Sequence, residues 1–334
     1  MSIDIKVMTR NLYLGADLQP VIDAVMADRP AVPRAAAAVL EQFHASDFPA
    51  RAECIAAEIA AHRPHVVGLQ EAFLLRHRKP SSLLAPPFKE LPAGDVVFDY
   101  ERLLLDRLAA RGVAYTSIVT TMGNDNQAPA GTPPDLEDVR VTDREVILLR
   151  GDLAEPGFGV LNAGAHVFAA RMAYGPFRDI RTWAHVDLTI GGRALRIAST
   201  HLQLELSEQS AALQVAQAEE LIAVHARRRD PLVIMGDFNS RPDGSTTATY
   251  RRFMEAGYRD AWIDAGDGPG FTCKPEELRD PARTFDQRID FVLHRNGLNA
   301  VDAVVTGSDP ANRTPSGLWP SDHGGVVATL RLEG

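Results

Sequence analysis

The segment around Gly236 constrains the fold of this chain more than any other stretch. Residues 232–235 form an apolar run that is typical of a short buried strand, and Gly236 ends it. Asp237 and Asn239 follow two residues apart, so the alternation of strand side chains points both the same way. Because ligands of open α/β sheets bind at the carboxyl ends of strands, the segment predicts a polar site at the edge of a sheet.

Apolar strands and amphipathic helices recur along the chain, and their patterns predict where they lie. Strands are expected at residues 3–9, 65–70, 113–121, 145–149, 160–169, 182–190, 194–200, 232–235, 288–294, 300–306 and 326–331. Helices are expected at residues 17–27, 35–43, 49–62, 97–111, 207–229 and 246–256, with Asp17, Asp47 and Ser207 as N-terminal caps of three of them. Residues 76–96 and 123–140 are polar and contain several prolines, so they are expected to form loops.

The order of these elements is mixed. It starts as β-α-β-α-β, continues through antiparallel strands joined at Gly191 and Gly192, and ends as β-α-β-α-β-β-β. A purely parallel sheet would need a crossover, usually a helix, between every pair of strands. The order therefore predicts an α/β fold in which two packed mixed sheets carry helices on their outer faces.

The charge of the chain argues against a general affinity for polyanions. The formal net charge is −9, so neither nucleic acid nor an anionic membrane gains a general attraction. No apolar run approaches the roughly 20 residues of a membrane span, and residues 3–8 are typical of a strand and not of a signal peptide. We therefore expect no stable membrane span, and a cytoplasmic protein if the chain is full length or a secreted one if a signal peptide was removed. Cys54 and Cys273 lack the spacing of a metal site.

Polar residues that a hydrolytic site can use lie at six strand ends. They are Asn11, Glu71, His201, the Asp237/Asn239 pair, Asp290 and the Asp322/His323 pair. Taken singly, each has a plainer explanation, since Glu71 suits a helix cap and a lone histidine such as His201 is more often structural. Their recurrence through the whole chain is the stronger signal, because one edge of the packed sheets would collect them.

Asp290 lies inside an apolar strand, where an unpaired charge is costly. The imidazole of His323 is a suitable partner, because a carboxylate holds one tautomer of the ring and stabilises its protonated form. Glu71 and Asp322 offer oxygen ligands for a hard divalent cation, and the lack of a Cys/His cage favours Mg²⁺ or Mn²⁺ over Zn²⁺. This chemistry suits phosphoester hydrolysis, whose transition state spreads charge over the phosphoryl oxygens.

Six short motifs, in this order, resemble the endonuclease/exonuclease/phosphatase superfamily. They are Thr9-Arg10-Asn11, Leu69-Gln70-Glu71, Ser199-Thr200-His201-Leu202, Gly236-Asp237-Phe238-Asn239, Arg288-Ile289-Asp290-Phe291 and Ser321-Asp322-His323. The superfamily includes pancreatic-type deoxyribonucleases, apurinic endonucleases, inositol polyphosphate 5-phosphatases and neutral sphingomyelinases. The resemblance covers residues 9–323 and implies a four-layer α/β sandwich, with two packed mixed β-sheets flanked by helices, as one catalytic domain over residues 1–334. Residues 11–17 also resemble a bacterial subgroup.

The resemblance implies a metal site that carries a Mg²⁺ or Mn²⁺ ion. Glu71 would be the main metal ligand, with Asn11 beside the metal and Asp322 also near it. The substrate would be a phosphate ester, attacked directly by an activated water molecule. We expect the enzyme to act as a monomer.

The resemblance also implies roles for the other strand-end residues. His323 would contact the scissile phosphate or act as the general base, and Asp290 would orient it. Asp237 would position or deprotonate the attacking water. Asn239 and His201 would hydrogen-bond the phosphoryl oxygens or the leaving group. The choice of the general base stays open between Asp237 and His323.

Two arginines near predicted strands are candidate substrate contacts. Arg144 and Arg181 each carry a planar guanidinium, which binds phosphate through two parallel hydrogen bonds. The alternative, a surface ion pair with Asp143 or Asp179 respectively, is somewhat favoured for each.

Several substrates fit this site, and a phosphodiester ranks first. A nucleic acid could use the basic residues Arg76, Arg78 and Lys79, although the net charge is unfavourable. A phospholipid headgroup could be reached through an apolar patch at Leu83, Leu84 and Phe88. The alternatives are a phosphomonoesterase acting on a soluble inositol or sugar phosphate and, less favoured because all six motifs are intact, a non-catalytic binding module.

Overall fold

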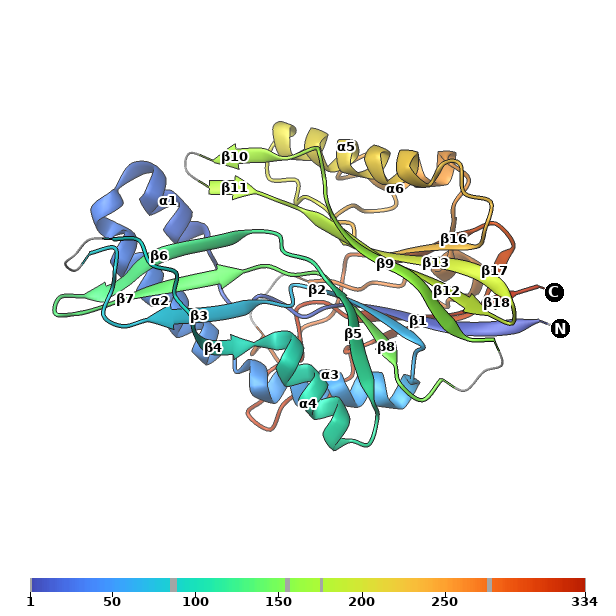
Figure 1. Cartoon of the computed structure of the whole chain (residues 1–334), viewed down its shortest axis with the longest axis horizontal. Helices are drawn as coiled ribbons and strands as arrows, with labels where there is room; N and C mark the ends of the chain where they lie inside the picture. The colour runs from blue at the N-terminus through green and yellow to red at the C-terminus, as the bar shows by residue number, and fades with distance from the viewer. Residues whose placement is uncertain (1, 85–88, 154–156, 175–176, 275–277, 334) are drawn as a thin grey trace.

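Two six-stranded sheets pack against each other at the centre of the computed structural model (Figure 1), which describes residues 2–84, 89–153, 157–174, 177–274 and 278–333. The first has the order β17-β18-β1-β2-β8-β5, formed by Leu298–Thr306, Gly325–Leu332, Ile3–Asn11, Val66–Gln70, Val146–Arg150 and Tyr115–Thr120. The second has the order β15-β16-β14-β13-β12-β9, formed by Arg259–Asp260, Asp290–Arg295, Leu232–Asp237, Arg193–His201, Thr182–Ile190 and Gly159–Val167.

Helices cover the outer face of each central sheet. Helices α3 (Phe48–His62) and α4 (Tyr100–Ala110) pack on the first sheet, and α5 (Glu208–His225) and α6 (Thr249–Glu255) pack on the second (Figure 1). The short helix α7 (Ala261–Ala265) follows β15. These four layers confirm the predicted α/β sandwich of two packed mixed sheets flanked by helices.

Burial on both faces explains why strand β14 is apolar throughout. Val233 and Met235 pack into the core between the two sheets, whereas Leu232 and Ile234 belong to the core beneath α5 and α6. A strand buried on both faces loses the alternation of polar and apolar residues. Gly236 is required at its end, because a Cβ atom there would lie 1.9 Å from the carbonyl oxygen of Thr200.

A third sheet forms around the two segments that were expected to be loops. The order of this third sheet is β4-β3-β7-β6, formed by Asp95–Asp99, Leu74–Arg78, Asp135–Thr142 and Asp125–Thr132. The loop prediction was wrong for residues 123–140, most of which lie in β6 and β7, whereas in residues 76–96 only the two ends lie in strands and the described residues between them, 79–84 and 89–94, contain no helix or strand. The proline at position 129 lies in β6, an edge strand, where a missing amide hydrogen breaks no necessary bond. One face of this sheet lies outside the central core and therefore carries polar residues. These residues obscured the apolar pattern that predicts a strand.

Two helices pack on the third sheet, at the left of Figure 1. They are α1 (Gln19–Ala27) and α2 (Val32–Ala45), joined by the 3₁₀ helix η1 (Arg29–Ala31). Helix α2 begins three residues before its predicted start, because Pro33 occupies its first turn, where proline is tolerated. Side chains of both helices meet apolar residues of β3, β6 and β7 in a separate core.

The remaining local predictions concern caps and turns. The Asp47 carboxylate accepts a hydrogen bond from the amide of Ala50, and Ser207 accepts one from the amide of Ser210, so these two of the three predicted caps are confirmed. The third was wrong: Leu18 and not Asp17 occupies the N-cap position of α1, although the Asp17 carboxylate accepts a hydrogen bond from the amide of Gln19. The turn at residues 191–192 joins β12 to β13, as expected. The other elements are the β10–β11 hairpin (Met172–Tyr174 and Phe177–Asp179) and the 3₁₀ helix η2 (Pro310–Asn312). No helix in the described part of the chain is long and apolar enough to cross a membrane.

Candidate active site

The six predicted strand ends meet at one edge of the two central sheets. Strands β1 and β2 run parallel, as do β13 and β14, so their carboxyl ends lie side by side. Strands β16 and β18 run antiparallel to these neighbours and therefore begin at the same edge, where Asp237 faces Asp290 directly in the register. We call the residues collected there the strand-end cluster: Asn11, Glu71, His201, Asp237, Asn239, Asp290, Asp322 and His323.

The side chain of Asn11 links carboxylates from the two sheets. Its Nδ2 donates to Oε1 of Glu71 at 3.0 Å and to Oδ2 of Asp237 at 3.1 Å. The backbone amide of Leu14 donates to the other oxygen of Glu71. These bonds hold Glu71 at a φ of 56°, which is uncommon for a residue with a side chain and typical of functional sites.

Burial brings these carboxyl groups close to neutrality in the absence of a cation. It raises the pKa of Glu71 to about 7, and the charge of Asp322 adds to the effect. It also raises the pKa of Asp237 to about 7, with a further contribution from the charge of Asp290. A divalent cation among these oxygen atoms would reverse the effect, because a positive charge favours the ionised carboxylates.

The donor set therefore fits a hard divalent cation. The carboxylates of Glu71, Asp237 and Asp322 and the amide of Asn11 are ligand types that Mg²⁺ and Mn²⁺ accept, but neither Glu71 nor Asp322 belongs to a group of mutually close ligand atoms within the described residues. Two groups in the described part of the chain offer ligand atoms within 4.8 Å of one another: Asp237 with Asp290 and His323, and Asp143 with Glu145 and His201. Both groups contain a histidine, whose imidazole nitrogen can also bind other transition metals.

Asp290 and His323 lie in hydrogen-bond contact, as the sequence predicted for these two residues. The Nδ1 atom of His323 lies 2.9 Å from Oδ2 of Asp290, and the hydroxyl of Thr272 donates to the same oxygen at 2.6 Å. The Nε2 atom of His323 lies 3.6 Å from Oδ2 of Asp237 and 3.5 Å from Sγ of Cys273. Burial alone would lower the pKa of His323, but the surrounding charges, that of Asp290 first, raise it well above the ordinary value.

His201 and Asn239 form a second pair within the cluster. Nδ2 of Asn239 lies 3.0 Å from Nε2 of His201 and donates to the carbonyl of Leu202. The backbone amide of Asn239 donates to Oδ1 of Asp237 at 2.9 Å, so the turn after β14 closes on its own aspartate. Burial lowers the pKa of His201 well below the ordinary value, which keeps its imidazole neutral.

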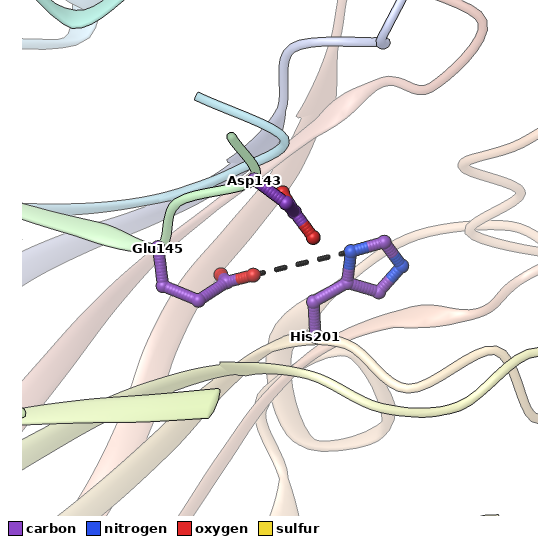
Figure 2. Close-up of side chains that lie close together, drawn as sticks. All are labelled: Asp143, Glu145 and His201. Atoms are coloured by element: carbon purple, nitrogen blue, oxygen red, sulfur yellow. Dashed lines mark ion pairs between the residues drawn. The ribbon is translucent and has the colours of Figure 1, made fainter. Parts of the chain in front are cut away.

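Two acidic residues that the sequence had not marked as site residues approach His201 from the start of β8. Figure 2 shows the carboxylates of Asp143 and Glu145 pointing toward the imidazole, with Oε1 of Glu145 4.0 Å from Nδ1. Within the described residues, Oε2 of Glu145, Oδ1 of Asp143 and Nδ1 of His201 are buried without a hydrogen-bond partner. Burial raises the pKa of both carboxyl groups. The two-residue spacing of these acids before a buried strand was the available signal.

The structure brings one of the two candidate arginines to the site. Arg181 lies 3.5 Å from Asp179 and close enough to Asp143 for that charge to act on it. Arg144 turns away: its Nη2 lies 2.5 Å from Oδ1 of Asp99, and its Nε donates to the carbonyl of Ala72. Arg144 is therefore corrected from a substrate contact to an ion pair, although its partner is not the Asp143 that the sequence suggested.

Two fully buried arginines hold the loops of the strand-end cluster, and sequence reasoning missed both. Arg51 donates to the carbonyl oxygens of Ser46, Leu12, Tyr13 and Pro320, which ties the turn after Asn11 to the segment before Asp322. Arg10 donates to the carbonyl of His323 and pairs with Glu58 at 3.1 Å. Both side chains position backbone: Arg10 lies in the first of the six motifs but was assigned no role, and Arg51 lies outside all six.

A pocket of about 310 Å³ opens from this edge of the sheets. Its polar end comprises Glu71, Asp143, Asp179, Arg181 and His201. The pocket extends from there between α1, α2 and the third sheet. A phosphate held at the polar end would thus have the rest of its ester facing the pocket.

The chain matches the sequence model of one known family, and its fold is similar to several solved structures. The sequence model of the endonuclease/exonuclease/phosphatase family matches residues 39–323, and no curated protein sequence matches. An endonuclease/exonuclease/phosphatase family protein from Bacteroides thetaiotaomicron has a TM-score of 0.61 at 15% identity, covering 100% of this chain and 96% of that one. A mannosyl-6-phosphatase from the same organism has a TM-score of 0.55 at 15% identity and 98% and 99% coverage. Truncated TDP2 from Caenorhabditis elegans has a TM-score of 0.53 at 17% identity and 98% and 97% coverage.

Proposed function

Because the chain belongs to the endonuclease/exonuclease/phosphatase family of divalent-metal-dependent phosphoester hydrolases, we propose that it hydrolyses a phosphodiester by direct attack of water in the presence of Mg²⁺ or Mn²⁺. One observation carries the proposal. Asp237 lies within reach of three side chains of different chemistry: the amide of Asn11 and the imidazoles of His201 and His323. A water molecule and a phosphoryl group are bound by such a mixture of acceptors and donors.

The residues divide the reaction between them. A bound cation supplies positive charge to the phosphoryl oxygens, and Glu71, Asn11 and Asp322 would hold it. Asp237 accepts a hydrogen bond from the attacking water and orients it, and either Asp237 or His323 takes its proton. Asp290 holds the ring of His323 with Nε2 turned toward the reaction. Asn239 and the neutral ring of His201 hydrogen-bond the phosphoryl oxygens or the leaving group, and Arg181 pairs with a non-bridging oxygen.

Phosphomonoester hydrolysis is the second candidate. It is favoured by the single arginine at the polar end of the pocket, since one guanidinium and one cation suffice for a compact dianion. A structural neighbour is named a mannosyl-6-phosphatase, which shows that the fold carries this activity elsewhere.

A substrate panel tests the proposal. Purified protein is treated with EDTA and then assayed with Mg²⁺, Mn²⁺ or Ca²⁺ on plasmid DNA, single-stranded RNA, sphingomyelin, phosphatidylcholine, bis-p-nitrophenyl phosphate and p-nitrophenyl phosphate. We expect hydrolysis of at least one diester that disappears with EDTA and returns with Mg²⁺ or Mn²⁺. Cleavage of p-nitrophenyl phosphate alone would assign the monoesterase.

The variant Glu71→Ala separates catalysis by this site from a contaminant. Its activity should fall by a factor of about 10³ or more, since the main metal ligand is lost. Glu255→Ala is the matched control, because Glu255 is a carboxylate with a side chain 54% exposed on α6, far from the cluster in the chain. Undiminished metal-dependent hydrolysis in Glu71→Ala, or no cleavage of any substrate, would overturn the proposal.

A further inference from the structure

Beyond its polar end, the pocket beside the strand-end cluster has an apolar wall. Helix α1 and the residue before it contribute Leu18, Val21 and Ile22, strand β6 contributes Ala128, and strand β7 contributes Val139 and Val141. We call this part of the cavity the apolar pocket. Helix α2 contributes Ala36 and Val39, so the apolar residues of the wall come from two helices and one sheet outside the four central layers, and Asn126 and Gln127 of β6 also line the cavity.

The apolar pocket borders the core beneath α1 and α2, and several of its residues are only partly covered by that core. Leu18, Val21, Ala128 and Val141 pack against the buried members of that core but remain only partly buried themselves. When an apolar group covers apolar surface that is exposed in a concavity, the free energy of the system falls. The wall is therefore suited to bind an apolar group.

The apolar pocket reaches the strand-end cluster at Glu71 and His201, the two members of the cluster that line the cavity. Leu14 shows the connection at one residue: its backbone amide donates to Glu71, and its side chain lines the pocket. His201 and Arg181 line the same cavity from the opposite sheet. A phosphoryl group held by these residues would place its esterified group against the apolar wall.

The charges around the pocket disfavour a polyanion. Its wall carries three carboxylates, Glu71, Asp143 and Asp179, and one guanidinium, Arg181. The basic residues that the sequence offered for nucleic acid are engaged elsewhere: Arg76 pairs with Asp125 at 3.2 Å, Arg78 donates to the carbonyl of Pro92, and Lys79 lies 3.6 Å from Asp135. One phosphate can be neutralised here, whereas flanking phosphates would meet carboxylates.

We propose that the apolar pocket selects the substrate, and that the substrate is a phosphate ester whose alcohol carries an apolar chain or ring. This inference rests on the proposed phosphoester hydrolysis and names its substrate class. The inference does not use the patch suggested for lipid contact, in which Leu84 is exposed, as expected, and Phe88 lies outside the described residues.

The volume of the pocket sets the size of that apolar group. The whole cavity, polar end included, has about 310 Å³, roughly twice the ~150 Å³ apolar cavity that takes one benzene ring. Because the phosphoryl group takes the polar end, the part left for the apolar group fits one ring or an alkyl chain of comparable volume. Since each buried methylene contributes about 0.8 kcal/mol, affinity rises by about fourfold per methylene until the pocket is full.

A homologous series of substrates tests the inference. The rate constant kcat/KM is measured for p-nitrophenyl phosphodiesters that carry a methyl, butyl or octyl group, with the metal that supports activity. We expect an increase of about fourfold per methylene from methyl to butyl, levelling off toward octyl. A flat or falling series, or faster cleavage of plasmid DNA than of the octyl ester, would overturn the inference.

Variants of the wall locate the effect. The double variant Leu18→Ser/Val21→Thr should lower the octyl-to-methyl ratio of kcat/KM by about 10-fold or more, because two apolar contacts are lost. Ala128→Leu fills the cavity without adding a polar group and should lower the same ratio. Met26→Thr is the matched control: Met26 is on the same helix, is 56% exposed and does not line the pocket. An unchanged ratio in both wall variants, with both folded, would contradict the inference.

A binding measurement separates this inference from the proposed function. Octylphosphonate and methylphosphonate, whose carbon–phosphorus bonds resist hydrolysis, are titrated into the wild-type protein by calorimetry. Tighter binding of octylphosphonate without cleavage of any ester would keep the apolar pocket and reject the hydrolase. Ester cleavage with equal binding of the two phosphonates would do the reverse. Cleavage of phosphatidylcholine vesicles that is lost in the wall variants would support the pocket with a lipid as the source of the apolar chain, and cleavage of the octyl ester alone would support it with a free ester.

Discussion

The strand-end cluster and the apolar pocket adjoin at Glu71 and His201, yet they are constructed in opposite ways. In the cluster, single polar atoms serve several partners, as Nδ2 of Asn11 does between two carboxylates. In the pocket, half-buried apolar side chains lie next to one another and no single contact dominates. The cluster stands on strands of the two central sheets, whereas the pocket stands on α1, α2 and the third sheet (Figure 1).

This difference suggests that different residues carry out the chemical step and choose the substrate. A polar network in a buried place depends on every member, because the loss of one partner leaves another buried and unpaired. Apolar contacts contribute small amounts that add up when the residues are independent. We therefore expect substitutions in the cluster to change rates by orders of magnitude for all substrates, and substitutions in the pocket to change only the ranking of substrates.

The variant Asp290→Asn should give the largest effect and sharpen the comparison most. The amide would no longer stabilise the protonated ring of His323 and could hold it in the wrong tautomer, so kcat should fall by about 10³- to 10⁴-fold. Steady-state kinetics with the methyl and octyl diesters should show the same loss for both. A loss confined to one ester would mean that reaction and selection are not separate.

The same variant has an expected signature in pH. The charge of Asp290 helps to keep the pKa of His323 well above its ordinary value despite burial, so the protonated form of the ring is favoured in the wild type. Removing that charge lowers the pKa. The alkaline limb of a pH–rate profile should then move to lower pH in Asp290→Asn, if the protonated ring contacts the phosphate. An unshifted limb would show that another group titrates there.

The variants Arg181→Ala and Arg144→Ala compare an arginine that lines the pocket with one that does not. Arg181→Ala should raise KM by about 10- to 100-fold for both esters, since one charge-assisted hydrogen bond to phosphate is lost. Arg144→Ala should leave KM within about twofold and instead lower the free energy of unfolding by about 1–3 kcal/mol, because the guanidinium bridges Asp99 and Glu101. Kinetics and thermal unfolding of both variants check this. A raised KM in Arg144→Ala would return that residue to the substrate.

The sequence was informative about the strand-end cluster for a physical reason. Glu71, Asp237 and Asp290 adjoin the strands β2, β14 and β16, which are buried along nearly their whole length, so a polar side chain there is costly and hence conspicuous. Asp290 within its apolar strand predicted a histidine partner, and His323 lies 2.9 Å away. The packed mixed sheets could be predicted as well, since the order of strands and helices limits the possible topologies.

The apolar pocket could not be predicted in the same way. Val21, Ala128 and Val141 are ordinary core residues in the sequence, and only their incomplete burial distinguishes them. The third sheet escaped detection because its strands are polar. Arg51 likewise binds backbone carbonyls, which no residue pattern records. The roles proposed for the strand-end residues and the single domain over residues 1–334 stay predictions.

Glu145→Gln should give the smallest effect and reveals what a buried carboxyl group beside the strand-end cluster costs in stability. Burial raises the pKa of Glu145 well above its ordinary value of 4.5, so the folded state binds its proton more tightly than the unfolded chain does. Wild-type stability is therefore lost progressively as pH rises above about 4.5, and glutamine removes this loss. In EDTA, the variant should melt about 2–4 °C higher than wild type at pH 8 and at the same temperature near pH 4. Glu255→Gln, at an exposed carboxylate, is the control that should show no such difference. A Glu145→Gln protein that is less stable than wild type at pH 8 would mean that a favourable contact holds the ionised Glu145 carboxylate. The buried carboxylate would then stabilise the fold.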